Sequence, residues 1–301
     1  MPEVHSHWIS STGQQGSSGK SEALFPYWSF TKTAIAICML KLAEQGHLDL
    51  DAHATDEPYT FRQLLQHNAG LPDYGHLKAY HAAVANRDAP WSRDTILELS
   101  LPNGLIYEPG HGWSYSNIGY MFLREKIEAL TAMPLGDVIS EFITQPLGLS
   151  SIKLATTQAD FNALHWDAAK TYDPRWVYHG CLFGTPIDAA HMLHALFQGR
   201  LLNSDSFAQM QETLILGGAL PGRPWTKCGY ALGLMSGESG AAGATVGHSG
   251  GGPFCVNAVY HFPDMPDPVT VASFTSGTDE GRAEHAAVEI ALCVGATRQT
   301  D

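Results

Sequence analysis

The sequence is poor in basic residues. It contains 17 lysines and arginines against 30 aspartates and glutamates, which gives a formal net charge of -13. Proteins that hold nucleic acid or an anionic membrane surface need clusters of basic residues, and no such cluster occurs here. The composition therefore argues against nucleic acid and membrane partners and favours a small molecule.

Long apolar segments are missing as well. The longest apolar run, Ala34 to Leu40, is far too short to span a bilayer. The first residues, Met-Pro-Glu-Val-His-Ser-His-Trp, have neither a basic start nor a hydrophobic segment, so they do not resemble a signal peptide. The sequence accordingly predicts a cytoplasmic protein.

Motifs for metal ions and disulfides are absent too. Cys-x-x-Cys does not occur, and the cysteines are odd in number and scattered, which favours buried free thiols over a disulfide framework or zinc ribbon. The 15 histidines include no His-Glu-x-x-His, and the pairs His76/His81 and His191/His194 lack an evident third ligand. We therefore expect no metal site. The five cysteines are Cys38, Cys181, Cys228, Cys255 and Cys293.

The first three quarters of the chain are predicted to be mainly helical. Residues 31–45 are almost wholly apolar as far as Lys41 and stop before Gly46, a pattern typical of a helix buried on all sides. Residues 11–20 are rich in serine and glycine and predict a loop. Further helices are expected at 60–67, 93–99, 118–130, 135–143 and 187–198.

After about residue 225 the pattern changes to short strands with β-branched or aromatic residues between turn signals. A closing helix is expected at 279–294, with Gly295 after it. This order predicts an α+β fold, in which an antiparallel sheet flanked by helices is built from residues 1–55 and 225–301 and a mainly helical domain, residues 56–224, is inserted. The strands are expected at 229–235, 244–248, 254–262 and 269–275.

One candidate nucleophile is Ser249, because Gly247-His-Ser-Gly-Gly251 matches the Gly-x-Ser-x-Gly nucleophile elbow. An elbow requires a sharp turn from a strand into a helix. The residues after Ser249 instead predict a continuing strand, and too few residues remain to complete an α/β-hydrolase sheet. We infer that Ser249 is not the nucleophile.

The alternative is Ser-x-x-Lys, which occurs at 17–20, 29–32 and 150–153. Only Ser29 and Lys32 open the apolar helix. Positions i and i+3 share a helix face, so the lysine amine lies near the serine hydroxyl and can help to remove its proton. The helix N-terminus suits a developing oxyanion, and burial of Lys32 favours its neutral, basic form.

Two further motifs are unique in the chain. Tyr115-Ser-Asn117 is its only Tyr-x-Asn, and His248-Ser-Gly250 is its only His-x-Gly. With Ser29-x-x-Lys32 before them, the sequence resembles the serine β-lactamase and penicillin-binding-protein superfamily, in particular its class C-like branch of esterases and D-amino-acid peptidases. The resemblance runs from about Leu24 to the C-terminus. The segments that resemble family sequences are 28–33, 64–74, 115–120 and 247–251.

This resemblance implies a β-lactamase/transpeptidase-like fold and an acyl-enzyme mechanism that needs no cofactor. Ser29 would attack a carbonyl, while Lys32 and Tyr115 would form the proton-transfer pair. The backbone N–H groups of Ser29 and Gly251 would form the oxyanion hole. The residues assigned to substrate binding are Asn117, His248, Ser249 and Gly250.

The N-terminal segment departs from the family pattern. Only 28 residues precede Ser29, where family members usually have a helix and a strand pair. We therefore expect part of the sheet to be shortened, absent or supplied by another chain, which leaves a homo-oligomer open.

The function expected from the resemblance is that of a serine hydrolase acting on a small ester, amide or peptide. A true β-lactamase and a non-catalytic binding module on the same fold are the alternatives. His248 stands where antibiotic-processing relatives usually carry lysine, and with an ordinary pKa near 6.5 it is mostly neutral at pH 7.5. We therefore expect uncharged substrates to be preferred over carboxylate-bearing β-lactams, and activity on β-lactams to improve towards pH 6.

Overall fold

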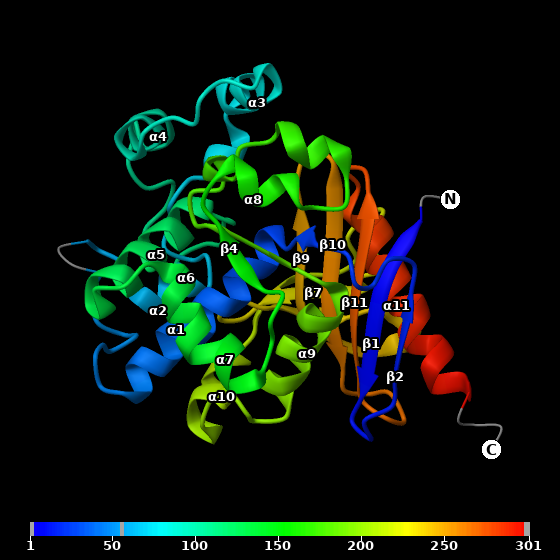
Figure 1. Ribbon diagram of the computed structural model, residues 1–301. Helices are drawn as coiled ribbons and strands as arrows, with labels where there is room; N and C mark the ends of the chain where they lie inside the picture. The colour runs from blue at the N-terminus through cyan, green and yellow to red at the C-terminus, as the bar shows by residue number, and fades with distance from the viewer. Residues whose placement is uncertain (1–2, 55–56, 298–301) are drawn as a thin grey trace.

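The larger of two sheets is antiparallel, has eight strands and lies on the right in Figure 1. The computed structural model describes residues 3–54 and 57–297, and the strand order in this part of the chain is β2-β1-β11-β10-β9-β8-β7-β6. The strands of this sheet are β1 (Val4–Ser10), β2 (Gln15–Ser18), β6 (Leu214–Gly217), β7 (Lys227–Tyr230), β8 (Met235–Glu238), β9 (Ala244–Gly251), β10 (Cys255–Phe262) and β11 (Val269–Ser276). A small second sheet has the order β3-β5-β4 and consists of β3 (Phe25–Pro26), β4 (Lys153–Ala155) and β5 (Cys181–Gly184).

Helices cover both faces of the large sheet. Helix α11 (Glu280–Thr297), red in Figure 1, packs on β9, β10 and β11, and α9 (Pro186–Phe197) packs on β1, β10 and β11. The side chains of β10 show that these helices lie on opposite faces. Val256, Ala258, Tyr260 and Phe262 form a core with α11, whereas Val259 belongs to the core that contains α9. This alternation is that of a strand buried on both sides, and the α+β class is confirmed.

Helix α1 (Thr31–Glu44) lies in the middle of the molecule, as its sequence predicts. Every residue from Thr31 to Leu40 is buried, and the helix packs on α5, α6 and α10. Its end is followed by Gly46, whose φ of 75° is left-handed. The other helices are α2 (Phe61–Leu65), α3 (Lys78–Asn86), α4 (Arg93–Ser100), α5 (Asn117–Thr131), α6 (Leu135–Ile139), α7 (Gln145–Leu147), α8 (Gln158–Asn162) and α10 (Ser204–Met210).

The N-terminal segment corrects two expectations. Residues 11–20 are not simply a loop, because Gln15–Ser18 forms β2 and pairs with β1 from Ser6↔Ser18 to Ile9↔Gln15. On its other side β1 pairs with β11 along its whole length. Residues 4–18 therefore supply a strand pair to the sheet from within this chain, where a shortened, absent or borrowed part of the sheet was expected.

The strand expected at 229–235 is instead a turn between two strands. β7 ends at Tyr230, β8 begins at Met235, and the turn between them packs against α1. Gly233 allows this contact: its φ is 70°, and a Cβ there would lie 2.5 Å from Ala36 Cβ and 2.9 Å from the Lys32 carbonyl oxygen. The prediction of one continuous strand failed because the close approach of this turn to α1 cannot be seen in the local sequence.

The division into residues 1–55 with 225–301 and residues 56–224 stays a prediction. Strand β6 falls in the middle range, yet it is an edge strand of the large sheet. Helix α9 also falls in that range and covers one face of the sheet. Residues of the range 56–224 thus contribute a strand and a helix to the layers of the large sheet.

The cysteines only partly follow the expectation of buried thiols. Cys38, Cys181 and Cys255 are buried, Cys228 is half-buried and Cys293 is exposed, and no disulfide joins any of them in the described chain. Among residues 3–54 and 57–297, no helix combines the length and apolarity needed to cross a membrane.

Several histidines are buried where α9 meets the sheet. The His7 ring stacks on that of His191 with centroids 5.5 Å apart, and the His261 ring stacks on Phe197 at 4.1 Å. Burial lowers the pKa of His7 and of His261 to about 4. This layer therefore requires neutral imidazoles.

We expect the free energy of unfolding to fall as the pH drops from 7 to 5. A histidine in the unfolded chain has a pKa near 6.5, so the unfolded state binds more protons than the folded state below that pH. The contribution of His261 is complete above pH 6.5 and is lost as the pH falls towards 4, and the loss by pH 5 is about 2 kcal/mol. Urea unfolding at pH 7, 6 and 5 measures this loss.

His261→Asn should flatten the pH dependence, because an amide can still bond Thr270 without titrating. His285→Asn on the exposed face of α11 is the matched control and should leave the slope as in the wild type. Equal slopes in all three proteins would contradict the assignment.

Candidate active site

Ser29 lies in a 3-10 turn, Trp28–Phe30, directly before α1. Trp28 has a φ of 45°, a left-handed conformation that is strained for a bulky side chain. Its buried indole holds this conformation by donating Nε1–H to Cys255 Sγ at 3.2 Å and packing edge-on against Tyr172 and Phe254. The turn leaves Ser29 half-buried and facing open space.

Lys32 lies one turn further along α1 and is fully buried. Its Nζ is 3.2 Å from Ser29 Oγ, 2.7 Å from Asn117 Oδ1 and 3.1 Å from His179 Nε2. Burial lowers the pKa of Lys32 to about 7, although the negative charge of Asp73 opposes this. A large share of the molecules therefore carries a neutral amine at neutral pH.

These contacts suit a neutral lysine. Burial lowers the pKa of His179 well below its usual range, so its ring is neutral and one nitrogen can accept a hydrogen bond. When Asn117 Oδ1 and His179 Nε2 accept the two amine N–H bonds, the nitrogen lone pair is left for Ser29 Oγ.

Asp73 fixes the orientation of Asn117. Its carboxylate accepts the Asn117 backbone N–H at 2.8 Å and the side-chain Nδ2–H at 3.1 Å. Because a carboxylate can only accept, the Asn117 amide nitrogen faces Asp73 and its oxygen faces Lys32. Asn117 is also the first residue of α5, whose N-terminus is capped by the Ser116 hydroxyl. The backbone of Asn117 is therefore fixed by the helix, and its side chain is fixed by Asp73.

Tyr115 brings a buried phenol to the same place. Its ring lies under Lys32 Nζ, 4.8 Å from the ring centroid, and packs on the His67 ring at 4.2 Å. Its hydroxyl makes no hydrogen bond of good geometry in the described chain, although the Ser29 side chain lies close enough to act on it. Burial raises the pKa of Tyr115 well above its usual range, although the Ser29 side chain opposes this, and the phenol is therefore neutral.

Strand β9 approaches the turn Trp28–Phe30 closely at Gly250. A Cβ on this residue would lie 2.8 Å from Trp28 Cβ, 2.8 Å from the Tyr27 carbonyl oxygen and 2.9 Å from Asn257 Nδ2. Gly250 therefore packs on the turn and lines neither cavity beside Ser29, and its assignment to substrate binding stays a prediction. The next residue, Gly251, does line the cavities beside Ser29.

His248 is committed to contacts within the protein. Its Nδ1–H donates to the Ser249 carbonyl, and its Nε2 accepts the Tyr230 hydroxyl at 2.9 Å. Burial lowers the pKa of His248 to about 3. The expectation that His248 gains a proton near pH 6 and then attracts β-lactams is wrong, because a fully buried ring of this kind stays neutral there.

Ser249 points into a charged network. Its hydroxyl donates to Glu280 Oε2 at 2.6 Å and accepts from Arg223 Nη2 at 3.0 Å. Arg223 in turn forms two short bonds to the carboxylate of Glu284, which is fully buried and also accepts Trp225 Nε1–H at 3.0 Å. Ser249 therefore borders the cavity wall without any contact to Lys32, in line with the inference that it is not the nucleophile.

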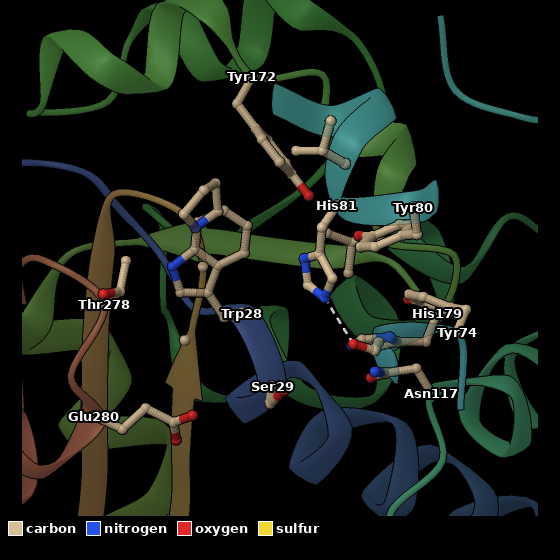
Figure 2. Close-up of a pocket in the computed structure, with 16 residues that line it drawn as sticks. Trp28, Ser29, Tyr74, Tyr80, His81, Asn117, Tyr172, His179, Thr278 and Glu280 are labelled. Atoms are coloured by element: carbon tan, nitrogen blue, oxygen red, sulfur yellow. Dashed lines mark hydrogen bonds between the residues drawn. The ribbon is translucent and has the colours of Figure 1, made fainter. Parts of the chain in front are cut away.

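Two cavities meet at Ser29. The smaller, of about 400 Å³, has an aromatic wall with Trp28, Tyr74, Tyr80 and Tyr172. Figure 2 shows Ser29 at its floor, with Glu280 and Thr278 on one side and Asn117 and His179 on the other. The larger, of about 700 Å³, includes Tyr115, Tyr230, His248 and Arg223 in its wall. Both cavities share Ser29, Gly75, Asn117, Gly251 and Glu280.

The structure thus brings Ser29, Lys32, Tyr115, Asn117 and Gly251 together, and their chemical roles stay predictions. Sequence reasoning assigned no role to Asp73, His179 or Glu280. Asp73 lies within the family-like segment 64–74, which was a usable signal. His179 and Glu280 stand in no motif, and only the fold brings them to the site.

Comparison with known proteins defines the class. The Beta-lactamase family model matches residues 3–294, and the chain belongs to this family. Penicillin-binding protein 4* of Bacillus subtilis (strain 168) is 33% identical over 148 residues, which cover 45% of this chain and 31% of that protein. Esterase EstB of Burkholderia gladioli is 29% identical over 157 residues, 45% of this chain and 40% of EstB. The matches thus span less than half the length of these relatives.

Solved structures share the fold. The D-amino acid amidase from Ochrobactrum anthropi SV3, in complex with L-phenylalanine, superposes with a TM-score of 0.81 over 100% of this chain and 94% of that chain, at 22% identity. This likeness confirms the β-lactamase/transpeptidase-like architecture.

The contact at Gly250 generates a prediction. Gly250→Ala should destabilise the protein by about 1–3 kcal/mol, because the new methyl forces β9 away from Trp28. It should also slow labelling of the protein by a fluorophosphonate probe, because Gly251 moves away from Ser29. Thermal unfolding and timed labelling measure the two effects.

Gly218→Ala is the matched control. The nearest atom to a Cβ at Gly218 is the Thr226 carbonyl oxygen at 3.9 Å, so the methyl has room. Its unfolding temperature and labelling rate should stay near those of the wild type. If both variants behave alike, the close approach of β9 is not a constraint.

Proposed function

We propose that this protein is a serine hydrolase that acts through an acyl-enzyme on a small ester or amide. The observation that carries the proposal is the buried Lys32 amine, 3.2 Å from Ser29 Oγ where the two cavities meet. A serine hydroxyl is a weak nucleophile until a neighbouring base takes its proton. Lys32 suits this task because its pKa of about 7 lies near neutral pH.

In the acylation step, Ser29 Oγ attacks the substrate carbonyl carbon and its proton passes to the neutral Lys32 Nζ. The carbonyl π pair moves to oxygen, and the N–H groups of Ser29 and Gly251 stabilise the resulting oxyanion. When the oxyanion collapses, the bond to the leaving group breaks. The leaving group takes the Tyr115 hydroxyl proton, and Lys32 returns its proton to the Tyr115 oxygen.

Hydrolysis of the acyl-enzyme reverses these roles. A water molecule replaces the leaving group, gives one proton to Lys32 and attacks the ester carbonyl. Collapse of the second oxyanion breaks the bond to Ser29 Oγ, which recovers a proton from Lys32, and the free acid leaves. Both protonatable groups end the cycle in their initial state.

The two cavities accommodate the two halves of the substrate. Tyr115 belongs to the wall of the larger cavity only, so a leaving group that takes its proton lies there. The acyl group then occupies the smaller, aromatic cavity. EstB is an esterase and the Ochrobactrum protein an amidase, and both classes of enzyme cleave an acyl bond, which agrees with this proposal.

Carboxylate-bearing β-lactams fit the cavity walls less well than uncharged substrates. His248 offers no positive charge, since burial keeps its pKa at about 3. Arg223 is paired with Glu284, and Glu280 adds a carboxylate to both walls. The expected preference for uncharged substrates over carboxylate-bearing β-lactams therefore rests on the charge of Glu280 and not on the titration of His248.

Labelling identifies the nucleophile. A fluorophosphonate probe should add to Ser29, and Ser29→Ala should abolish both labelling and hydrolysis of p-nitrophenyl esters. Ser249→Ala, the matched control in the elbow-like motif, should retain measurable labelling because Ser249 has no contact with Lys32. An adduct found on Ser249 by mass spectrometry would overturn the proposal, and absence of any adduct would favour a non-catalytic binding module.

The pH dependence tests the base. We expect kcat/KM for an uncharged ester to rise with pH through about 7 and then level off, because Lys32 must lose its proton to accept that of Ser29. The carboxylate of Asp73 raises the pKa of Lys32, so Asp73→Asn should move this limb to lower pH while it lowers the plateau. A limb that stays in place or moves to higher pH would show that another group titrates.

A further inference from the structure

Glu280 is the only carboxylate among the described residues that line the two cavities. It is the first residue of α11, and its side chain is about one-third exposed. It lies beside Ser29 in the wall that both cavities share (Figure 2). A substrate bound across Ser29 therefore meets this carboxylate whichever cavity its larger part occupies.

Arg223 offsets the charge of Glu280 only in part, because it is shared with a second carboxylate. Arg223 lies 3.5 Å from Glu280 Oε2, but it forms its two short bonds with the buried carboxylate of Glu284. The three side chains together carry one surplus negative charge. Desolvation at a cavity wall strengthens the attraction of such a charge for a cation compared with open solvent.

Of the two carboxylate oxygens of Glu280, Oε1 is free to accept a hydrogen bond. Oε2 takes the Ser249 hydroxyl, whereas Oε1 has no hydrogen-bond donor within the described chain. Oε1 lies beside Gly251, since a Cβ on that glycine would be 3.0 Å from it. The unused oxygen thus sits next to the backbone group assigned to the oxyanion hole.

We propose that Glu280 is a specificity-determining residue that binds a protonated amine of the substrate, so that the preferred substrates are esters or amides with an ammonium close to the scissile carbonyl. The inference rests on the proposed function. Because Gly251 N–H would hold the carbonyl oxygen, a cation at Glu280 Oε1 has to lie within a few bonds of the carbonyl carbon.

The smaller cavity supports the same class of substrate. Its wall carries the rings of Trp28, Tyr74, Tyr80 and Tyr172, which can hold an apolar side chain and whose faces also attract cations. An acyl group with an amine and an aromatic side chain therefore satisfies Glu280 and the aromatic wall at once.

The test compares matched substrates that differ only in the amine. Phenylalanine p-nitroanilide, in both enantiomers, is compared with its N-acetyl derivative and with 3-phenylpropionyl p-nitroanilide, which lacks the amine. Because hydrogen bonds to charged groups are the strong class, Glu280→Gln should lower the kcat/KM ratio of amine to amine-free substrate by roughly tenfold or more. Comparing ratios cancels any effect of the variant on Lys32, which both substrates share.

Glu289→Gln removes the same charge from an exposed position on α11 and is the matched control. It should leave the ratio as in the wild type. A second pair, the 2-aminoethyl and ethyl esters of 3-phenylpropionic acid, places the amine in the leaving group. If Glu280→Gln changes the kcat/KM ratio of this ester pair but not that of the anilide pair, the inference is also supported, and the cation is located in the larger cavity.

Binding separates this inference from the proposed function. In Ser29→Ala, calorimetry should show phenylalaninamide binding more tightly than 3-phenylpropionamide, and Ser29→Ala/Glu280→Gln should lose that difference. The same binding preference without any labelling of Ser29 would contradict the hydrolase and not the role of Glu280. If Glu280→Gln changes neither the kinetic ratios nor the binding difference, Glu280 is structural and the inference is wrong.

Discussion

The contact between the Lys32 amine and Ser29 Oγ is the interaction on which the site depends. It requires a lysine that is buried without a carboxylate in direct contact, since Asp73 acts on it only across Asn117. Such burial is costly for a charged amine and favours the neutral one. The polar groups of Asn117 and His179 compensate for part of that cost, and they also orient the amine. The burial that costs folding free energy therefore also leaves the Lys32 amine neutral in a large share of the molecules at pH 7.

Holding this contact open to substrate imposes a second constraint, on the backbone. Trp28 keeps a left-handed φ of 45° so that Ser29 faces the cavities, and the surrounding aromatic rings hold that strain. Strand β9 can then bring Gly251 beside Ser29 only because Gly250 has no side chain. The glycine of the third motif is therefore required by its packing against the turn that carries Ser29.

Much of this could be predicted from the sequence, because the signals were local. The apolar run of α1 and the three ordered motifs placed Ser29, Lys32 and Tyr115 correctly in one site. The remaining features depend on contacts between segments far apart in the chain, and these contacts could not be predicted from the sequence. The β7–β8 turn rests on α1 through Gly233, β1 and β2 pair across a stretch that looks like a loop, and His179 reaches Lys32 from a distant segment. His248 was assigned its ordinary pKa because its burial cannot be seen in the sequence.

The charge of the two cavities also depends on residues outside the sequence motifs. The third motif places His248 in the sheet, where Tyr230 and the Ser249 carbonyl occupy both ring nitrogens, so this strand contributes no charge. The charge comes instead from α11, which is laid along the sheet by the alanine-rich face that packs on β10. That packing brings Glu280 to the cavities and buries Glu284, which forms the shorter bonds to Arg223 and so shares this cation with Glu280. The motifs thus place Ser29, Lys32 and Tyr115 together, whereas the negative charge at the cavities comes from α11, which lies outside the motifs.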